Sequence, residues 1–176
     1  MIKTQIGEYV VGAYLKRGMG CDVVDYNVRP PTGGLEGLAE FDVLGLRFND
    51  SVAMLCEVTT HLDGLNYKNN KETVRRIREK HERQRRYAKK HLAHFEKVRF
   101  MFWSPVVPRG YLTEELAKIT TLDLVINEKY KACVDLLRKD AKETTRDLGN
   151  PFLRSYRGRP YYSKGRHQVG KSRYDH

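Results

Sequence analysis

Hydrophobic residues along this chain follow two different spacings. Where apolar side chains recur every three or four positions, the pattern predicts a helix, and short runs rich in β-branched and aromatic residues predict a strand. The sequence predicts helices over 4–17, 70–95, 113–119 and 129–145, and strands over 21–29, 39–48, 51–60, 98–103 and 122–127. Strands 39–48 and 51–60 flank a turn at Asn49 and Asp50, so they are expected to pair as an antiparallel hairpin.

The element order, α-β-β-β-α-β-α-β-α, favours an α/β fold in which one mixed central β-sheet is flanked by helices. The core is expected to lie within residues 1–148 as a single domain. From 149 to 176 the apolar period disappears and Arg, Lys, Tyr and Gly dominate. This second part is expected to be a basic C-terminal tail outside the core.

The net charge of the chain indicates what kind of partner it has. The 176 residues carry a formal net charge of +11, whereas the hydrophobic content of 40% is ordinary. A basic balance of this size indicates nucleic acid first, and an anionic membrane or an acidic protein second. No apolar segment reaches the roughly 20 residues that cross a bilayer, no signal peptide is visible, and the three cysteines are odd in number. We therefore expect a cytoplasmic protein in a reducing compartment, without a membrane partner.

Two carboxylates occupy strand positions where core residues would be expected. Asp42 and Glu57 both have apolar neighbours, and strand alternation in a hairpin can bring them side by side. Two close carboxylates repel unless a cation lies between them, and their oxygens suit Mg²⁺ or Mn²⁺. Such an ion stabilises the charge on a phosphate under attack, so phosphodiester hydrolysis is the leading chemistry. The alternative is that both carboxylates are structural, facing solvent or paired with arginine.

Three segments of the chain resemble the PD-(D/E)XK nuclease superfamily. They are the helix IGEYVVGAYLKRG and the strands AEFDVLG and LCEVTT, whose layout is similar to that of archaeal Holliday-junction resolvases and small resolvase-like bacterial nucleases. The likeness covers roughly the first hundred residues. It implies a restriction-endonuclease-like fold.

The same resemblance implies roles for individual residues. Asp42, Glu57 and the main-chain carbonyl of Val58 would bind Mg²⁺ or Mn²⁺, and Glu8 would be an outer carboxylate from the first helix. Glu40 matches an acidic residue that often precedes the metal-binding aspartate. Gln84 and Tyr87 are similar to a glutamine and a tyrosine on the helix that follows the second acidic strand in related nucleases.

Thr59 stands where the superfamily has a lysine that orients or activates the attacking water. A threonine hydroxyl cannot supply that positive charge. Some members of the superfamily take the cation from the following helix, so Lys71 is the expected substitute, with Lys68 and His61 as further candidates. Members that have lost the lysine altogether act as binding or structural modules. The expected catalytic residues are Glu8, Asp42, Glu57, Thr59, Lys71 and Gln84.

Basic side chains in the long helix and in the tail are expected to contact phosphates. Lys and Arg far outnumber Asp and Glu between residues 68 and 97, so i,i+4 pairing cannot neutralise them. In the tail, arginines alternate with tyrosines, a combination that suits unpaired bases. A solvated helix face and a solubilising tail are the alternatives. The expected nucleic-acid-binding residues are Arg75, Arg76, Arg83, Arg86, Lys89, Arg154, Arg157 and Arg159.

These patterns lead to one function and two rivals. The leading hypothesis is a metal-dependent nuclease-like protein that hydrolyses DNA, with RNA less favoured. Its main rival is a catalytically inactive protein of the same fold that serves as a nucleic-acid-binding or assembly subunit, and Thr59 separates the two. A basic protein-interaction module is the third. Whether the chain forms a homodimer or joins a larger complex stays open.

Overall fold

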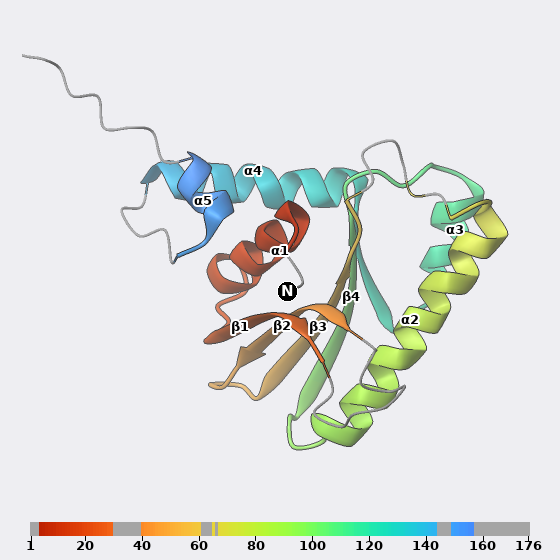
Figure 1. Ribbon diagram of the computed structural model, residues 1–176, viewed down its shortest axis with the longest axis horizontal. Coiled ribbons are helices and arrows are strands. Elements are labelled where there is room, and N and C mark those ends of the chain that lie inside the picture. The colour runs from red at the N-terminus through yellow and green to blue at the C-terminus, as the bar shows by residue number, and fades with distance from the viewer. Residues whose placement is uncertain (1–3, 30–39, 61–64, 66, 144–148, 157–176) are drawn as a thin grey trace, which may run out of the picture.

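The computed structural model describes residues 4–29, 40–60, 65, 67–143 and 149–156 (Figure 1). Five strands form one mixed sheet in the order β1-β2-β3-β4-β5. The strands are β1 (Val23–Val28), β2 (Phe41–Arg47), β3 (Val52–Val58), β4 (Lys97–Ser104) and β5 (Leu122–Ile126). The pairs β1–β2 and β2–β3 are antiparallel, whereas the pairs β3–β4 and β4–β5 are parallel. The predicted α/β class, the mixed sheet and the hairpin of β2 and β3 are confirmed.

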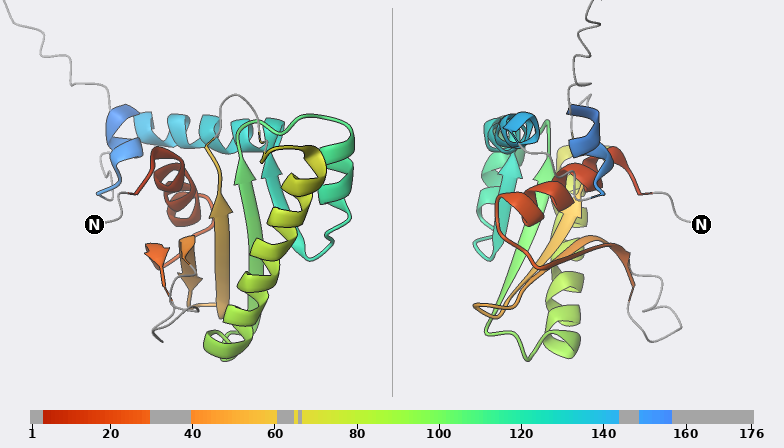
Figure 2. Two further views of the ribbon diagram at one scale, coloured as in Figure 1. Left: turned by 45° about the vertical axis from the view of Figure 1, so that its right-hand side comes forward. Right: turned by 90° about the vertical axis from the view of Figure 1, so that its left-hand side faces the viewer.

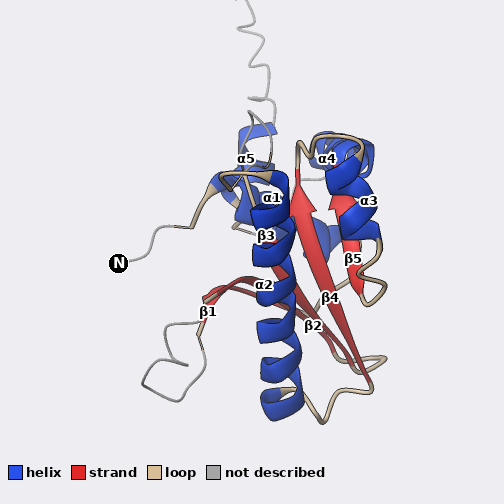
Figure 3. Cartoon of the chain, turned by 90° about the vertical axis from the view of Figure 1, so that its right-hand side faces the viewer, coloured by secondary structure: helices blue, strands red, loops and turns tan. Residues whose placement is uncertain are grey.

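Helices cover both faces of this sheet (Figures 1 and 2). They are α1 (Ile6–Arg17), α2 (Asn70–His91), α3 (Tyr111–Ala117), α4 (Asn127–Glu143) and α5 (Pro151–Tyr156). The apolar sides of α1 and α4 pack on one face, and those of α2 and α3 pack on the other. Figure 3 shows α2 running along the sheet as the longest element of its layer. None of the described helices is both long and apolar enough to span a membrane.

The central strands β3 and β4 carry the core. Every position of β3 except the last is buried, because the strand is paired on both edges and covered on both faces. Successive residues of β4 divide between the two layers. Trp103 packs in the cluster that includes α1 and α4, with its ring edge-on to Tyr14, and Phe102 packs with α2 and α3.

The C-terminal helix α5 belongs to this core, contrary to the boundary expected after residue 148. Phe152 and Leu153 are buried against α1 and α4. Asn150 caps the helix by accepting the N–H groups of both residues, and its own amide donates to the carbonyl of Tyr9 at 2.9 Å. Two apolar side chains and one cap therefore fix a segment that composition alone assigned to the tail. Arg157 and Arg159 lie outside the described residues.

Candidate active site

Asp42 and Glu57 lie across from each other on the side of the sheet that α2 covers. The hairpin register pairs Val43 with Cys56 and Leu44 with Leu55, so its continuation sets Asp42 opposite Glu57. Glu57 is only 3% exposed. Oδ2 of Asp42 accepts the main-chain N–H of Val58 at 2.6 Å. The structure thus brings together the two carboxylates that strand alternation predicted as neighbours.

Lys80, from the middle of α2, supplies the positive charge at this site. Its Nζ lies 2.6 Å from Oε2 of Glu57. Lys71, the substitute expected from the sequence, is exposed on the first turn of α2, about 13 Å back along the helix axis at 1.5 Å per residue. Lys68 precedes the helix and is also exposed, and His61 lies outside the described residues. The expectation for Lys71 is therefore corrected to Lys80.

Helix phase explains why Lys80 reaches the carboxylates. It lies one turn before Gln84, whose side chain points at β3, so it stands on the flank of α2 that borders the sheet. Sequence reasoning missed it because α2 is crowded with cations. The available signal was its i,i+4 spacing from Gln84, which marks the inner side of the helix.

Burial dominates the electrostatics of the pair. It raises the pKa of Glu57 and that of Asp42, and Lys80 offsets the shift only in part. Burial also acts to lower the pKa of Lys80, but the charges of Glu57 and Asp42 outweigh it and raise that pKa. Lys80 is therefore protonated at neutral pH. Arg83, one turn further along α2, adds positive potential at both carboxylates.

Glu8 reaches the same region from α1, which lies on the other face of the sheet. It is 7% exposed, and its Oε2 accepts the main-chain N–H of Gln5 at 2.9 Å. Burial raises the pKa of Glu8, and the negative charges of Asp42 and Glu40 add to the rise. Glu40 itself pairs with Arg29. Glu8 is thus close enough to sense Asp42, as an outer carboxylate would be.

Two buried polar atoms at this site have no hydrogen-bond partner within the described part of the chain. They are Oε1 of Glu57 and Oγ1 of Thr59. The two residues are separated by one position, so their side chains point to the same side of the strand. Leaving a buried acceptor unpaired costs about 1–3 kcal/mol. These two oxygen atoms are therefore available to bind a polar occupant, such as a water molecule or a metal ion.

The oxygen atoms present fit a hard divalent cation. The unpaired Oε1 of Glu57, the carboxylate of Asp42 and the carbonyl of Val58 are the donor types that Mg²⁺ and Mn²⁺ prefer. No group of three or more His, Cys, Asp or Glu side chains that could hold a metal is found among the described residues. A main-chain carbonyl and water would therefore have to complete the coordination.

Gln84 was expected at the catalytic site, but the structure uses it to anchor α2. Its side chain is 0% exposed, and its Nε2 donates to the carbonyl of Leu55 at 3.0 Å. Its Oε1 lies 3.3 Å from Nδ1 of His81, whose Nε2 lies 2.8 Å from Oγ1 of Thr121. Both polar ends of Gln84 are engaged within the core, so this residue is corrected from a catalytic to a structural role. Tyr87 packs its ring against Phe41.

The five α2 cations that were expected to bind nucleic acid divide into two sets. Arg75 and Arg76 pair with Glu72, and Arg75 also pairs with Glu79. A second set is exposed and forms no ion pair with any described residue: Arg83, Arg86 and Lys89. On α5, Arg154 is exposed as well. The second set is the one whose charge other side chains do not already match.

Comparisons with known proteins add no assignment to this geometry. No protein family model matches the sequence, and neither a curated protein nor a solved structure matches it. A functional conclusion must therefore come from the chemistry of the site itself.

Proposed function

We propose that this protein is a metal-dependent nuclease with a restriction-endonuclease-like fold that hydrolyses phosphodiester bonds in DNA. One observation carries the proposal. Asp42, which is half-buried, and Glu57, which is buried, come from neighbouring strands and share a site with the amine of Lys80, and Oε1 of Glu57 has no hydrogen-bond partner among the described residues. Buried charge in this arrangement is costly and is typical of functional sites.

Each residue has a distinct task in this proposal. Asp42, Glu57 and the carbonyl of Val58 would hold Mg²⁺ or Mn²⁺, which lowers the pKa of a bound water and offsets charge on the phosphate. The ammonium of Lys80 orients the attacking water and stabilises the negative charge that develops on the phosphate oxygens. Lys80 thereby does from α2 what Thr59 cannot do from the strand. Glu8 accepts hydrogen bonds from water at the rim.

Nucleic acid would approach along one flank of α2. Arg76, Lys80 and Arg83 recur at intervals of four and three residues, so they lie above one another on the same side of the helix. That side borders the carboxylates, since Lys80 contacts Glu57 and Arg83 acts on both acids. Cations in a row beside a metal site guide a phosphate backbone toward it.

Cleavage assays test the proposal. Single-stranded, duplex and branched DNA and RNA are incubated with the purified protein and Mg²⁺, Mn²⁺ or EDTA. We expect cleavage that requires the metal, that Asp42→Asn abolishes without loss of binding, and that Lys80→Met reduces by at least tenfold. Lys71→Met is the matched control, because it removes the same charge from the same helix away from the site. If the wild type cuts none of these substrates with either ion, the enzymatic proposal is refuted.

The inactive binding subunit has two observations in its favour. Lys80 already neutralises Glu57, and no cluster of three metal-ligating side chains is seen in the part of the chain that the structure describes. Under this alternative, the wild type cuts nothing, and Asp42→Ala binds DNA as tightly as the wild type does.

A further inference from the structure

A small cavity lies beside the candidate active site and shares a wall with it. Its volume is about 230 Å³, and its lining consists of Tyr67, Arg76, Glu79, Lys80 and Arg83. Clefts that hold drug-sized ligands measure roughly 300–1,000 Å³, so this cavity suits a single planar group with an attached anion. Since Lys80 also contacts Glu57, a ligand in the cavity lies next to the carboxylates.

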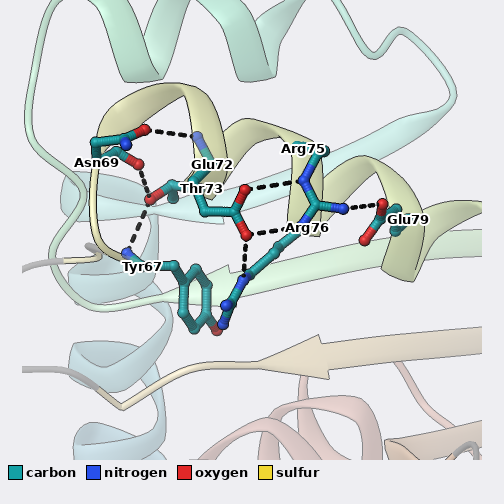
Figure 4. A network of polar contacts seen from close by, with 7 residues as sticks. All are labelled: Tyr67, Asn69, Glu72, Thr73, Arg75, Arg76 and Glu79. Carbon is teal, nitrogen blue, oxygen red and sulfur yellow. Dashed lines mark hydrogen bonds and ion pairs between the residues drawn. The ribbon is translucent and has the colours of Figure 1, made fainter.

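Two planar side chains, stacked one over the other, form part of the cavity wall and are called the platform: Arg76 lies over the ring of Tyr67, which also packs against the core cluster under α2 and α3. The guanidinium carbon of Arg76 lies 5.1 Å from the centroid of the Tyr67 ring (Figure 4). Nε of Arg76 is held 2.8 Å from Oε1 of Glu72, so the guanidinium cannot turn freely. Guanidinium planes and aromatic rings are the two side-chain surfaces on which unpaired bases stack.

The platform is fixed in place by the N-terminus of α2. The main-chain N–H of Tyr67 donates to Oγ1 of Thr73 at 2.9 Å, and Oγ1 of Thr73 donates to the carbonyl of Asn69 at 2.8 Å. The side chain of Asn69 accepts the N–H of Glu72 at 2.9 Å (Figure 4). Because these bonds position the platform before any ligand binds, ordering it costs little on binding.

The charge of the lining favours an anion. Within the lining, Arg76 pairs with Glu72, Lys80 pairs with Glu57, and the acid Glu79 pairs with Arg75. Arg83 has no ion pair with any described residue, so its positive charge is available to an anion. A planar platform beside cations is complementary to a nucleotide, which joins a flat base to a phosphate. In a continuous duplex the bases are already stacked and paired, so they are not free to enter.

We propose that this cavity binds one unpaired nucleotide of a single strand, with its base on the Tyr67–Arg76 platform and its phosphate against Lys80 and Arg83. The inference rests on the proposed function in taking nucleic acid as the substrate. It adds a substrate class, because a nucleotide held here sets the adjoining phosphodiester beside Asp42 and Glu57. Single strands, flaps and frayed ends are substrates, and uninterrupted duplex is not.

Binding of labelled oligothymidylate, oligouridylate and a blunt DNA duplex, measured by fluorescence anisotropy in Ca²⁺, tests the proposal. Base stacking accounts for roughly 5- to 150-fold in affinity per base, so Tyr67→Leu and Arg76→Lys should each weaken single-strand binding by about tenfold and leave duplex binding unchanged. Arg76→Lys keeps the charge and removes only the plane. Tyr67→Phe keeps the ring and should bind like the wild type. Arg75→Lys is the matched control, because Arg75 also pairs with Glu72 but does not line the cavity.

A photochemical readout identifies the contact directly. An oligonucleotide carrying one 5-iodouracil should cross-link to Tyr67, as located by mass spectrometry. The cavity proposal is overturned if Tyr67→Leu and Arg76→Lys bind both single strands as tightly as the wild type does, or if they lose single-strand and duplex affinity equally. In either case, metal-dependent cleavage by the wild type would still support the nuclease proposal. If the wild type cuts nothing but both variants lose single-strand affinity alone, the cavity proposal stands and the nuclease proposal falls. Stronger loss on oligothymidylate than on oligouridylate identifies DNA as the ligand, and the reverse identifies RNA.

Discussion

The carboxylates at the site destabilise the folded state when they are ionised. Burial raises the pKa values of Glu8, Asp42 and Glu57 above those of exposed carboxyls. A raised carboxyl pKa means that the folded state binds the proton more tightly than the unfolded state does. Folding is therefore favoured at low pH, and this contribution is lost as the pH rises above the ordinary carboxyl range. Groups that destabilise the fold at neutral pH are typical of sites kept for function.

Asp42→Asn should stabilise the protein at neutral pH. The amide keeps an oxygen to accept the N–H of Val58 and removes the buried charge. We expect a higher Tm than that of the wild type at pH 7–8, and the difference should shrink as the pH falls through the raised pKa of Asp42 and the carboxyl takes up its proton. A gain of about 1 kcal/mol corresponds to roughly 2–4 °C for a chain of this size. Thermal unfolding monitored by circular dichroism across this pH range measures it.

Asp50→Asn is the control of opposite sign. Asp50 is exposed and pairs with Arg47, whose hydrogen bonds lower the pKa of Asp50. Stability from a lowered pKa is present above the ordinary carboxyl range and is lost as the pH falls. Asp50→Asn should therefore leave the Tm at pH 7–8 unchanged or lower it. A lower Tm for Asp42→Asn across the whole pH range would mean that the charge of Asp42 supports the fold, contrary to the argument.

Strand periodicity was sufficient to place Asp42 beside Glu57, because a hairpin register and side-chain alternation fix neighbours at once. Lys80 could not be found in the same way. Its helix contains cations on almost every turn, and only the three-dimensional contact with Glu57 singles it out. The platform of Tyr67 and Arg76 was equally hidden, since Tyr67 lies in a loop where no period predicts its direction.

At the scale of elements, α2 is tied to the sheet by a chain of buried polar side chains. Gln84 bonds to Leu55 of β3, and His81 continues the chain to Thr121, ahead of β5. Burial lowers the pKa of His81, so the imidazole is neutral at neutral pH. These bonds set the rotation of α2 about its axis, and with it the direction of Lys80. Gln84 and His81 thus affect the site only by positioning Lys80.

Gln84→Met should weaken the fold without removing the chemistry. The change leaves the Leu55 carbonyl and Nδ1 of His81 without their side-chain partner. Unpaired buried groups cost about 1–3 kcal/mol each, so urea denaturation should show a loss in that range. Cleavage per folded molecule, assayed well below the unfolding midpoint, should fall less than fivefold, whereas Lys80→Met should lose far more. If Gln84→Met is well folded but cleaves nothing, Gln84 is a catalytic residue after all.

Long periodic elements were predictable, and so were the short helix α3, Tyr111–Ala117, and the short strand β5, but the shortest helix was missed. The long helix was expected over 70–95 and is α2, Asn70–His91. It ends early because Leu92 leaves helical geometry, with φ −119°, as the chain turns toward β4. The short α5 was missed, since six residues offer too few turns for an apolar period. Its stability comes from tertiary burial of Phe152 and Leu153, which a local pattern cannot show.

At the scale of the whole molecule, the domain ends later than composition indicated. Truncation after residue 148 removes Phe152, Leu153 and the Asn150 cap, and it uncovers the apolar sides of α1 and α4. Loss of a buried Phe or Leu costs about 2–5 kcal/mol, so the Tm should fall by roughly 10 °C or more. Truncation after Tyr156 keeps α5 and is the matched control. Equal melting of the two truncated chains would place α5 outside the stable core.

The distribution of charge over the molecule predicts how binding responds to salt. Arg83, Arg86 and Lys89 are exposed without an ion pair to any described residue, so phosphates can take their charge. Changing all three to Gln should make the slope of log K against log salt shallower by about 2–3 on duplex DNA, at about 0.9 per lost phosphate contact. Changing Arg75, Arg78 and Arg85 to Gln alters the net charge equally, but each of these already pairs with a glutamate. If net charge alone determined binding, the two triple variants would have the same slope. If unpaired cations determine it, only the Arg83, Arg86 and Lys89 variant should show a clearly shallower slope.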